Sequence, residues 1–172
     1  MTPPVSESLQ LLRPLPTGAF DTRAVPAQTV EAILDIAARA PSGTNTQPWN
    51  VVAVSGAARD RIAQHAMQQA EGLAHDAARR EAFWQACQAH PLARDWFAES
   101  PARSADPRLA AALAQDGGGS VRALRHYFDF QGAPLALFIL LHEQLGVGSV
   151  LDMGMFLQNI VLAAQARGLR AE

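Results

Sequence analysis

The segment between Pro41 and Trp49 contains the side chains best suited to holding a ligand. It offers hydroxyls from serine and threonine, amides from asparagine and glutamine, and backbone N–H groups around Gly43. These groups supply hydrogen-bond donors and acceptors without net charge, so they suit a polar but uncharged part of a ligand. Serine, glycine, asparagine and proline are also the usual residues of turns, and composition alone favours an ordinary loop.

The other patterns that could carry chemistry are incomplete. His142-Glu143 begins like a zinc-protease motif, but Gly146 stands where its second histidine belongs. Ser149 lacks the following glycine of a nucleophile elbow, and no G-x-G-x-x-G sequence follows a predicted strand. We therefore predict no metal site, and the sequence identifies no catalytic acid or base.

Apolar periodicity predicts the elements that position the loop. Apolar residues at helical spacing predict a helix over residues 27–40, which Pro41 should end. The apolar run 51–54 predicts a buried strand directly after the loop, and the run 133–141 predicts an interior strand.

Three further segments carry weaker signals. The alanine-rich residues 57–89 are predicted to be helical, with Gly72 as a breaking point and Cys87 as a small buried hydrophobe. Prolines predict an extended arm over residues 1–26, and residues 90–119 are predicted to form a surface excursion.

The last predicted helix is uncharged over most of its length. Ser149 and Asp152 have the spacing of an N-cap followed by an acidic residue, and Gly168 stands where a helix ends in a left-handed cap. Residues 153–166 carry no charge and are apolar on every face. Such a helix must be buried all round, yet it is shorter than a membrane span. Burial against a second copy of the chain predicts a homodimer.

Composition narrows the class of protein. The chain has 172 residues, of which 49% are hydrophobic and 17% charged, as expected for a folded domain with a sizeable core. A net charge of −2 with scattered basic residues gives no basis for a nucleic-acid partner. Residues 1–16 lack the pattern of a signal peptide, and no apolar run reaches the length of a membrane span. We therefore expect a cytoplasmic protein that does not interact with a membrane.

Three motifs, in this order along the chain, resemble those of the nitroreductase family. The first comprises Ala40–Ser42, Asn45 and Gln47–Trp49, and it leads into a predicted strand. The second is Gly132–Pro134, which opens an apolar strand, and the third is the segment Gly148–Leu169. Three motifs in order are more specific than any one of them.

This resemblance implies an α+β fold, a three-layer sandwich in which helices flank a central β-sheet, assembled as an intertwined homodimer. It implies FMN bound at the subunit interface and hydride transfer from NAD(P)H through the flavin. The final acceptor would be a small molecule such as a nitroaromatic or a quinone. The resemblance also implies a set of flavin-binding residues, in which Gln47 mainly supports the loop: Pro41, Ser42, Gly43, Asn45 and Gln47.

The chain departs from the family's pattern at the phosphate motif. Family members usually carry Arg-Arg-Ser-x-Arg before an Ala-Phe pair, and these side chains hold the FMN phosphate. Residues 14–18, which precede Ala19-Phe20 here, contain no cation. Thr17 offers the only hydroxyl, and Arg13 stands one residue outside the motif.

A second departure concerns the C-terminal end. The family continues well past the match to Leu169, so we expect residues 1–172 to form a single nitroreductase-like domain that is incomplete at its C-terminus. The alternative hypothesis is a truncated, non-catalytic remnant of the fold, acting at most as a dimerising or binding module.

Overall fold

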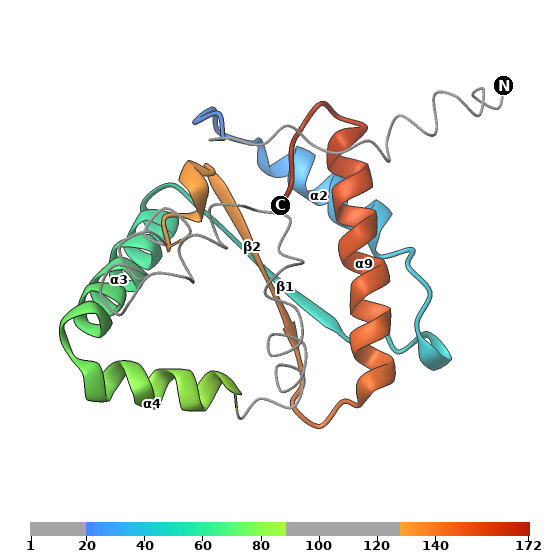
Figure 1. The fold of residues 1–172 in the computed structure, drawn as a ribbon. Coiled ribbons are helices and arrows are strands. Elements are labelled where there is room, and N and C mark those ends of the chain that lie inside the picture. Colours follow the sequence, from blue (N-terminus) through green and yellow to red (C-terminus); the bar gives the residue numbers. More distant parts are fainter. Residues whose placement is uncertain (1–19, 89–127) are drawn as a thin grey trace, which may run out of the picture. The chain divides into compact units, whose positions relative to one another are not determined.

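The computed structural model describes residues 20–88 and 128–172 of the chain (Figure 1). The chain divides into two compact units, one made of residues 1–56 and 134–172 and the other of residues 57–133. Several predictions concern parts outside the described residues: most of the N-terminal arm with Arg13 and Thr17, the excursion at 90–119, and the burial of the Cys87 side chain.

The first unit begins with helix α2, Ala27–Ala37, which confirms the predicted helix. The α-helix ends three residues before the predicted end at Ala40, so that boundary was wrong. The last turn tightens instead, and the N–H groups of Arg39 and Ala40 donate to carbonyls three residues back, at 3.2 and 2.9 Å. This tightening brings the chain to Pro41, whose ring disfavours helical geometry at the residue before it.

Two antiparallel strands form the sheet of this unit, and both were predicted. Strand β1, Trp49–Ser55, pairs with β2, Leu135–Leu141, in a register that places Trp49 opposite Leu141. The prediction of buried strands was wrong in part, because both strands contain exposed apolar residues. Val52 and Leu140 are exposed, whereas Phe138, which pairs with Val52, is half-buried. Apolar strand sequences therefore do not show here how many faces are buried.

The covered face carries the hydrophobic core of the unit. Helices α2 and α9 (Val147–Gln165) lie side by side against the two strands (Figure 1). Side chains at alternate strand positions pack against buried residues of both helices, as the pleat of a β-sheet requires. The strand residues in this core are Trp49, Val51, Leu137 and Ile139.

Helix α9 begins at Val147, three residues before the start implied by the predicted N-cap at Ser149. The predicted N-cap at Ser149 was wrong, because Gly146 occupies the cap position and the Ser149 N–H already donates to its carbonyl at 3.0 Å. The predicted C-terminal cap is confirmed. Gly168 has a φ of +71°, and the Leu169 N–H reaches back to the Ala164 carbonyl at 3.0 Å, as in a Schellman motif.

Only one side of α9 is buried within the chain. The packed side contains Phe156, Ile160, Ala163 and Ala164. On the other side Val147 and Leu151 are 70% and 67% exposed, so the single chain does not bury every face of the helix, and burial against a second copy stays a prediction. Among the described helices, α9 alone is also long and apolar enough to cross a membrane, contrary to expectation. Core helices of soluble proteins pass the same test, so this is weak evidence.

The second unit contains most of α3, Gly56–His75, followed by α4, Ala77–Gln88. The predicted helical segment does divide in two, but the break falls at Asp76 and the prediction of Gly72 was wrong. The Asp76 carboxylate accepts a hydrogen bond of 3.0 Å from the Arg79 N–H, which is the geometry of an N-cap. A side chain able to cap a new helix therefore decides the break, and α3 tolerates the glycine.

Arg59 of α3 stabilises the turn that precedes β2. Its side chain is 11% exposed, donates to the Ala133 carbonyl at 3.0 Å and pairs with the Asp129 carboxylate at 2.8 Å. The turn needs this support, because Phe130 and Gln131 both have positive φ angles ahead of Gly132.

Candidate functional site

The predicted ligand-binding residues all lie on the loop that joins α2 to β1. A short 3-10 turn, η1 (Gly43–Asn45), occupies its middle. Thr44, Asn45 and Gln47 adopt positive φ angles of 53°, 57° and 48°. Such conformations cost roughly 1–3 kcal/mol each for residues other than glycine, and they concentrate at functional sites. A loop that holds three of them within four residues is more than an ordinary turn.

Hydrogen bonds inside the loop hold this conformation. The Gln47 N–H donates to the Ser42 hydroxyl oxygen at 2.9 Å, and the Gln47 side-chain amide donates to the Asn45 side-chain oxygen at 3.2 Å. The Asn45 N–H closes the turn onto the Ser42 carbonyl at 2.9 Å. Gln47 therefore braces the loop from within.

Several donors of the loop are left available for a ligand. The Ser42 hydroxyl hydrogen, the Thr44 N–H and the Asn45 side-chain NH₂ have no acceptor among residues 20–88 and 128–172. Thr44 and Asn45 are exposed, and Ser42 is half-buried. The Gly43 N–H is already used, because it donates to the Asp152 carboxylate at 3.0 Å. Sequence reasoning missed Thr44, because its contribution depends on a backbone orientation that threonine seldom adopts.

Helix α9 contacts the residues at both ends of the loop. The Phe156 ring stacks on Trp49 with centroids 4.5 Å apart and planes 9° from parallel. The Asn159 side-chain NH₂ donates to the Ala37 carbonyl, the last residue of α2, at 3.4 Å. Sequence reasoning missed both roles, although the spacing of Asp152, Phe156 and Asn159 places them on one helical face.

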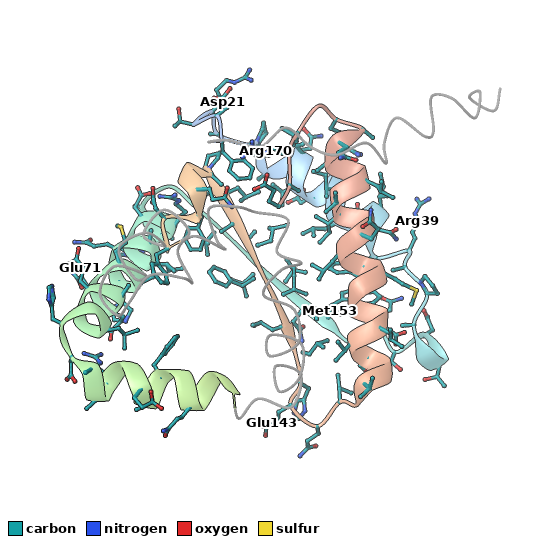
Figure 2. The ribbon with its side chains drawn as sticks, in the orientation of Figure 1. Asp21, Arg39, Glu71, Glu143, Met153 and Arg170 are labelled. Carbon is teal, nitrogen blue, oxygen red and sulfur yellow. The ribbon has the colours of Figure 1, made fainter. Side chains whose placement is uncertain are left out.

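The surroundings of the loop offer few charges for a ligand. Arg39, just before the loop, points away from α9 (Figure 2), and its side chain has no partner among the described residues. Asp152 is the acidic side chain that contacts the loop. Within residues 20–88 and 128–172, no three histidine, cysteine, aspartate or glutamate side chains gather where they could hold a metal ion. The described residues of the loop therefore offer a ligand mainly uncharged hydrogen-bonding groups.

Comparison with known proteins decides the family. The sequence profile described as "Nitroreductase family" matches residues 19–171, which is most of the chain. The chain belongs to the nitroreductase family. The predicted resemblance is thereby confirmed, and the family's motifs fall on the α2–β1 loop, on the turn into β2 and on α9.

Related nitroreductases match most of this chain but extend beyond it. The chloronitrobenzene nitroreductase of Comamonas testosteroni is 30% identical over 150 residues, covering 87% of this chain and 65% of the relative. The nitroreductase NfnB of Mycolicibacterium smegmatis is 34% identical over 156 residues, covering 88% of this chain and 62% of the relative. This nitroreductase chain therefore spans less than two thirds of their length.

Solved structures confirm the α+β nitroreductase fold. The FMN-dependent nitroreductase NfnB from Mycobacterium smegmatis, in complex with NADPH, superimposes with a TM-score of 0.63 at 28% identity, covering 95% of this chain and 71% of that one. A nitroreductase with bound FMN from Bacteroides fragilis gives 0.54 at 20% identity, covering 97% of this chain and 67% of that one. The latter likeness bears on the fold alone.

Proposed function

We propose that this chain binds FMN on the loop from Pro41 to Gln47 and transfers reducing equivalents from NAD(P)H to a nitroaromatic or quinone-like acceptor. The observation that carries the proposal is the strained, internally braced loop with donors on Ser42, Thr44 and Asn45 that have no acceptor in the described structure, in a chain of the nitroreductase family. The names of the relatives support the acceptor class, since they include a 4-nitrobenzoate reductase of Pseudomonas putida.

The residues of the loop fit a flavin ring. The ring system carries carbonyl oxygens and ring nitrogens that accept hydrogen bonds, and the Ser42 hydroxyl, the Thr44 N–H and the Asn45 amide are donors. Pro41 and Gly43 would line the same surface without offering a donor, because proline lacks an N–H and that of Gly43 is taken by Asp152. When bound, FMN supplies the hydride chemistry, while the protein binds and orients it.

The exposed side of α9 supports a homodimer. Val147, Leu151 and Met155 recur every four residues, so they form one apolar stripe along the helix, and all three are exposed. A stripe of this kind on a soluble protein marks an interaction surface. We propose that a second copy of the chain covers it, which would also meet the requirement of an uncharged helix for burial.

Substituting Leu151 by arginine tests the dimer. We expect the native chain to sediment as a dimer at micromolar concentration and Leu151→Arg to sediment as a monomer, because a charge in an apolar interface core is costly. Ile62→Arg, at an exposed apolar site on α3, is the matched control and should leave the dimer intact. Analytical ultracentrifugation gives the masses, and a monomeric native chain at high concentration would contradict the proposal.

Flavin titration tests the site. We expect FMN added to the purified chain to show saturable quenching of flavin fluorescence, and Asn45→Ala to weaken the affinity about tenfold through the loss of a hydrogen bond from the loop. Asn50→Ala, which removes an exposed amide from β1, is the matched control and should bind like the native chain. At saturating FMN the native chain should then oxidise NADPH in the presence of 4-nitrobenzoate.

Failure of that titration would favour the other function. A native chain without saturable FMN binding would overturn the enzyme proposal and leave the non-catalytic dimerising module. Binding without NADPH or NADH oxidation would restrict the chain to flavin binding.

A further inference from the structure

The loop from residue 38 to residue 48 is attached to α9 by three side chains that follow one another along the helix. Asp152, Phe156 and Asn159 are spaced by four and then three residues, so they project from the same face. Asn159 contacts the end of α2, Asp152 contacts the middle of the loop, and Phe156 contacts Trp49 where the loop enters β1. The helix thus fixes both ends of the loop and its centre.

The middle attachment has the features of a positioning contact. The Asp152 carboxylate oxygen Oδ2 accepts from the Gly43 N–H at 3.0 Å, and these residues are 109 positions apart. A hydrogen bond to a charged acceptor is about twice as strong as one between neutral groups. In the described structure this is the single bond of the Asp152 side chain, which caps no helix and pairs with no cation. Its carboxylate is therefore directed to the loop.

The contact acts where the backbone is most strained. Gly43 precedes Thr44 and Asn45, the two consecutive residues with positive φ angles, and its carbonyl accepts from the Thr44 hydroxyl at 2.7 Å. Holding the Gly43 N–H in place restrains the backbone immediately before Thr44 and Asn45, the two residues with positive φ angles. Because the carboxylate accepts from the Gly43 N–H, that donor is no longer available to a ligand. The donors of Ser42, Thr44 and Asn45 have no acceptor in the described structure and remain available.

We propose that Asp152 is a positioning residue for the flavin site: its carboxylate holds the loop in its strained conformation before any ligand arrives. The inference rests on the proposed function for its link to FMN. Asp152 would act through the Gly43 N–H without touching the flavin. The feature that matters is its hydrogen-bond acceptor, because a negative charge near the loop would itself disfavour an anionic ligand such as FMN.

Two substitutions separate the acceptor from the charge. Asp152→Asn keeps a side-chain oxygen that can accept from Gly43 and removes the charge, whereas Asp152→Ala removes both. We expect Asp152→Ala to bind FMN about 10- to 100-fold more weakly than the native chain, in line with the loss of one charged hydrogen bond. Asp152→Asn should restore the affinity to within about threefold of native, since a neutral bond replaces the charged one. Gln68→Ala, at an exposed polar site on α3, is the control and should change nothing.

Amide hydrogen exchange provides a readout that needs no flavin. In the flavin-free native chain the Gly43 N–H should exchange more slowly than that of Thr44, which has no acceptor in the described structure. Asp152→Ala should abolish this difference and Asp152→Asn should preserve it. A native chain that shows the exchange difference but binds no flavin would overturn the proposed function. The inference that Asp152 positions the loop would still stand. Unchanged Gly43 exchange and unchanged FMN affinity in Asp152→Ala would overturn the inference itself, as would an Asp152→Asn variant as impaired as Asp152→Ala.

Discussion

Two arginines placed ahead of Ala19-Phe20 should raise the affinity of this chain for FMN by about two to four orders of magnitude. The double variant Leu15→Arg/Gly18→Arg restores the second and fifth positions of the family's Arg-Arg-Ser-x-Arg pattern, where this chain has no cation. Each charge-assisted bond to a phosphate is worth roughly 1.5–3 kcal/mol, and every 1.4 kcal/mol is about a tenfold change in affinity. Fluorescence titration of FMN into the native and double-variant chains measures the gain.

Riboflavin separates this effect from any general change in the site. It carries the same ring without the phosphate, so the double variant should bind riboflavin as the native chain does. The native chain should in turn bind FMN and riboflavin with affinities within about tenfold of each other, since the loop proposed to face the ring carries no charged side chain. The neutral variant Leu15→Gln/Gly18→Gln controls for side-chain size. A native chain that already prefers FMN by more than a hundredfold would mean that another cation holds the phosphate, and the expected gain would then be absent.

The loop and its neighbouring elements were predictable because their signals are local. Helical spacing followed by Pro41 predicts where α2 gives way to the loop, and the apolar run after Trp49 predicts β1. The left-handed cap at Gly168 was likewise predictable, since glycine populates positive φ at no steric cost. The family motifs then added the ligand class, which composition alone did not.

The errors arose where a distant partner or a competing local group decides the structure. Asp152 has the sequence spacing of a helix-capping residue, yet its carboxylate reaches the Gly43 N–H across 109 residues, and no pattern within α9 indicates that partner. The helix break at Asp76 shows that a capping carboxylate outweighs the permissive backbone of Gly72. Thr44 was overlooked for the opposite reason, since its side-chain type argues against the positive φ that exposes its N–H.

Truncating Phe156 should produce the largest loss of stability among single substitutions in the first unit. Its side chain is 1% exposed, it belongs to the core shared by α2, α9 and the strands, and its ring stacks on Trp49. Phenylalanine-to-alanine changes in cores cost about 3–5 kcal/mol because they remove apolar contacts and leave a cavity. We expect Phe156→Ala to lower the free energy of unfolding by that amount in urea titrations, and Phe156→Leu by less than half of it, because leucine refills most of the space.

Leu157→Ala is the informative comparison for this loss, because this neighbouring side chain on the same helix is 38% exposed. Within one chain its truncation should cost well under half as much as that of Phe156, since far less apolar surface leaves the core. If α9 is also the dimer contact, the cost of Leu157→Ala should grow with protein concentration, because it weakens an association, whereas that of Phe156→Ala should not. Phe156→Ala should further weaken flavin binding, since the released Trp49 ring no longer fixes the end of the loop. Equal and concentration-independent costs at the two positions would contradict the one-sided burial of α9 on which both the core assignment and the dimer proposal depend.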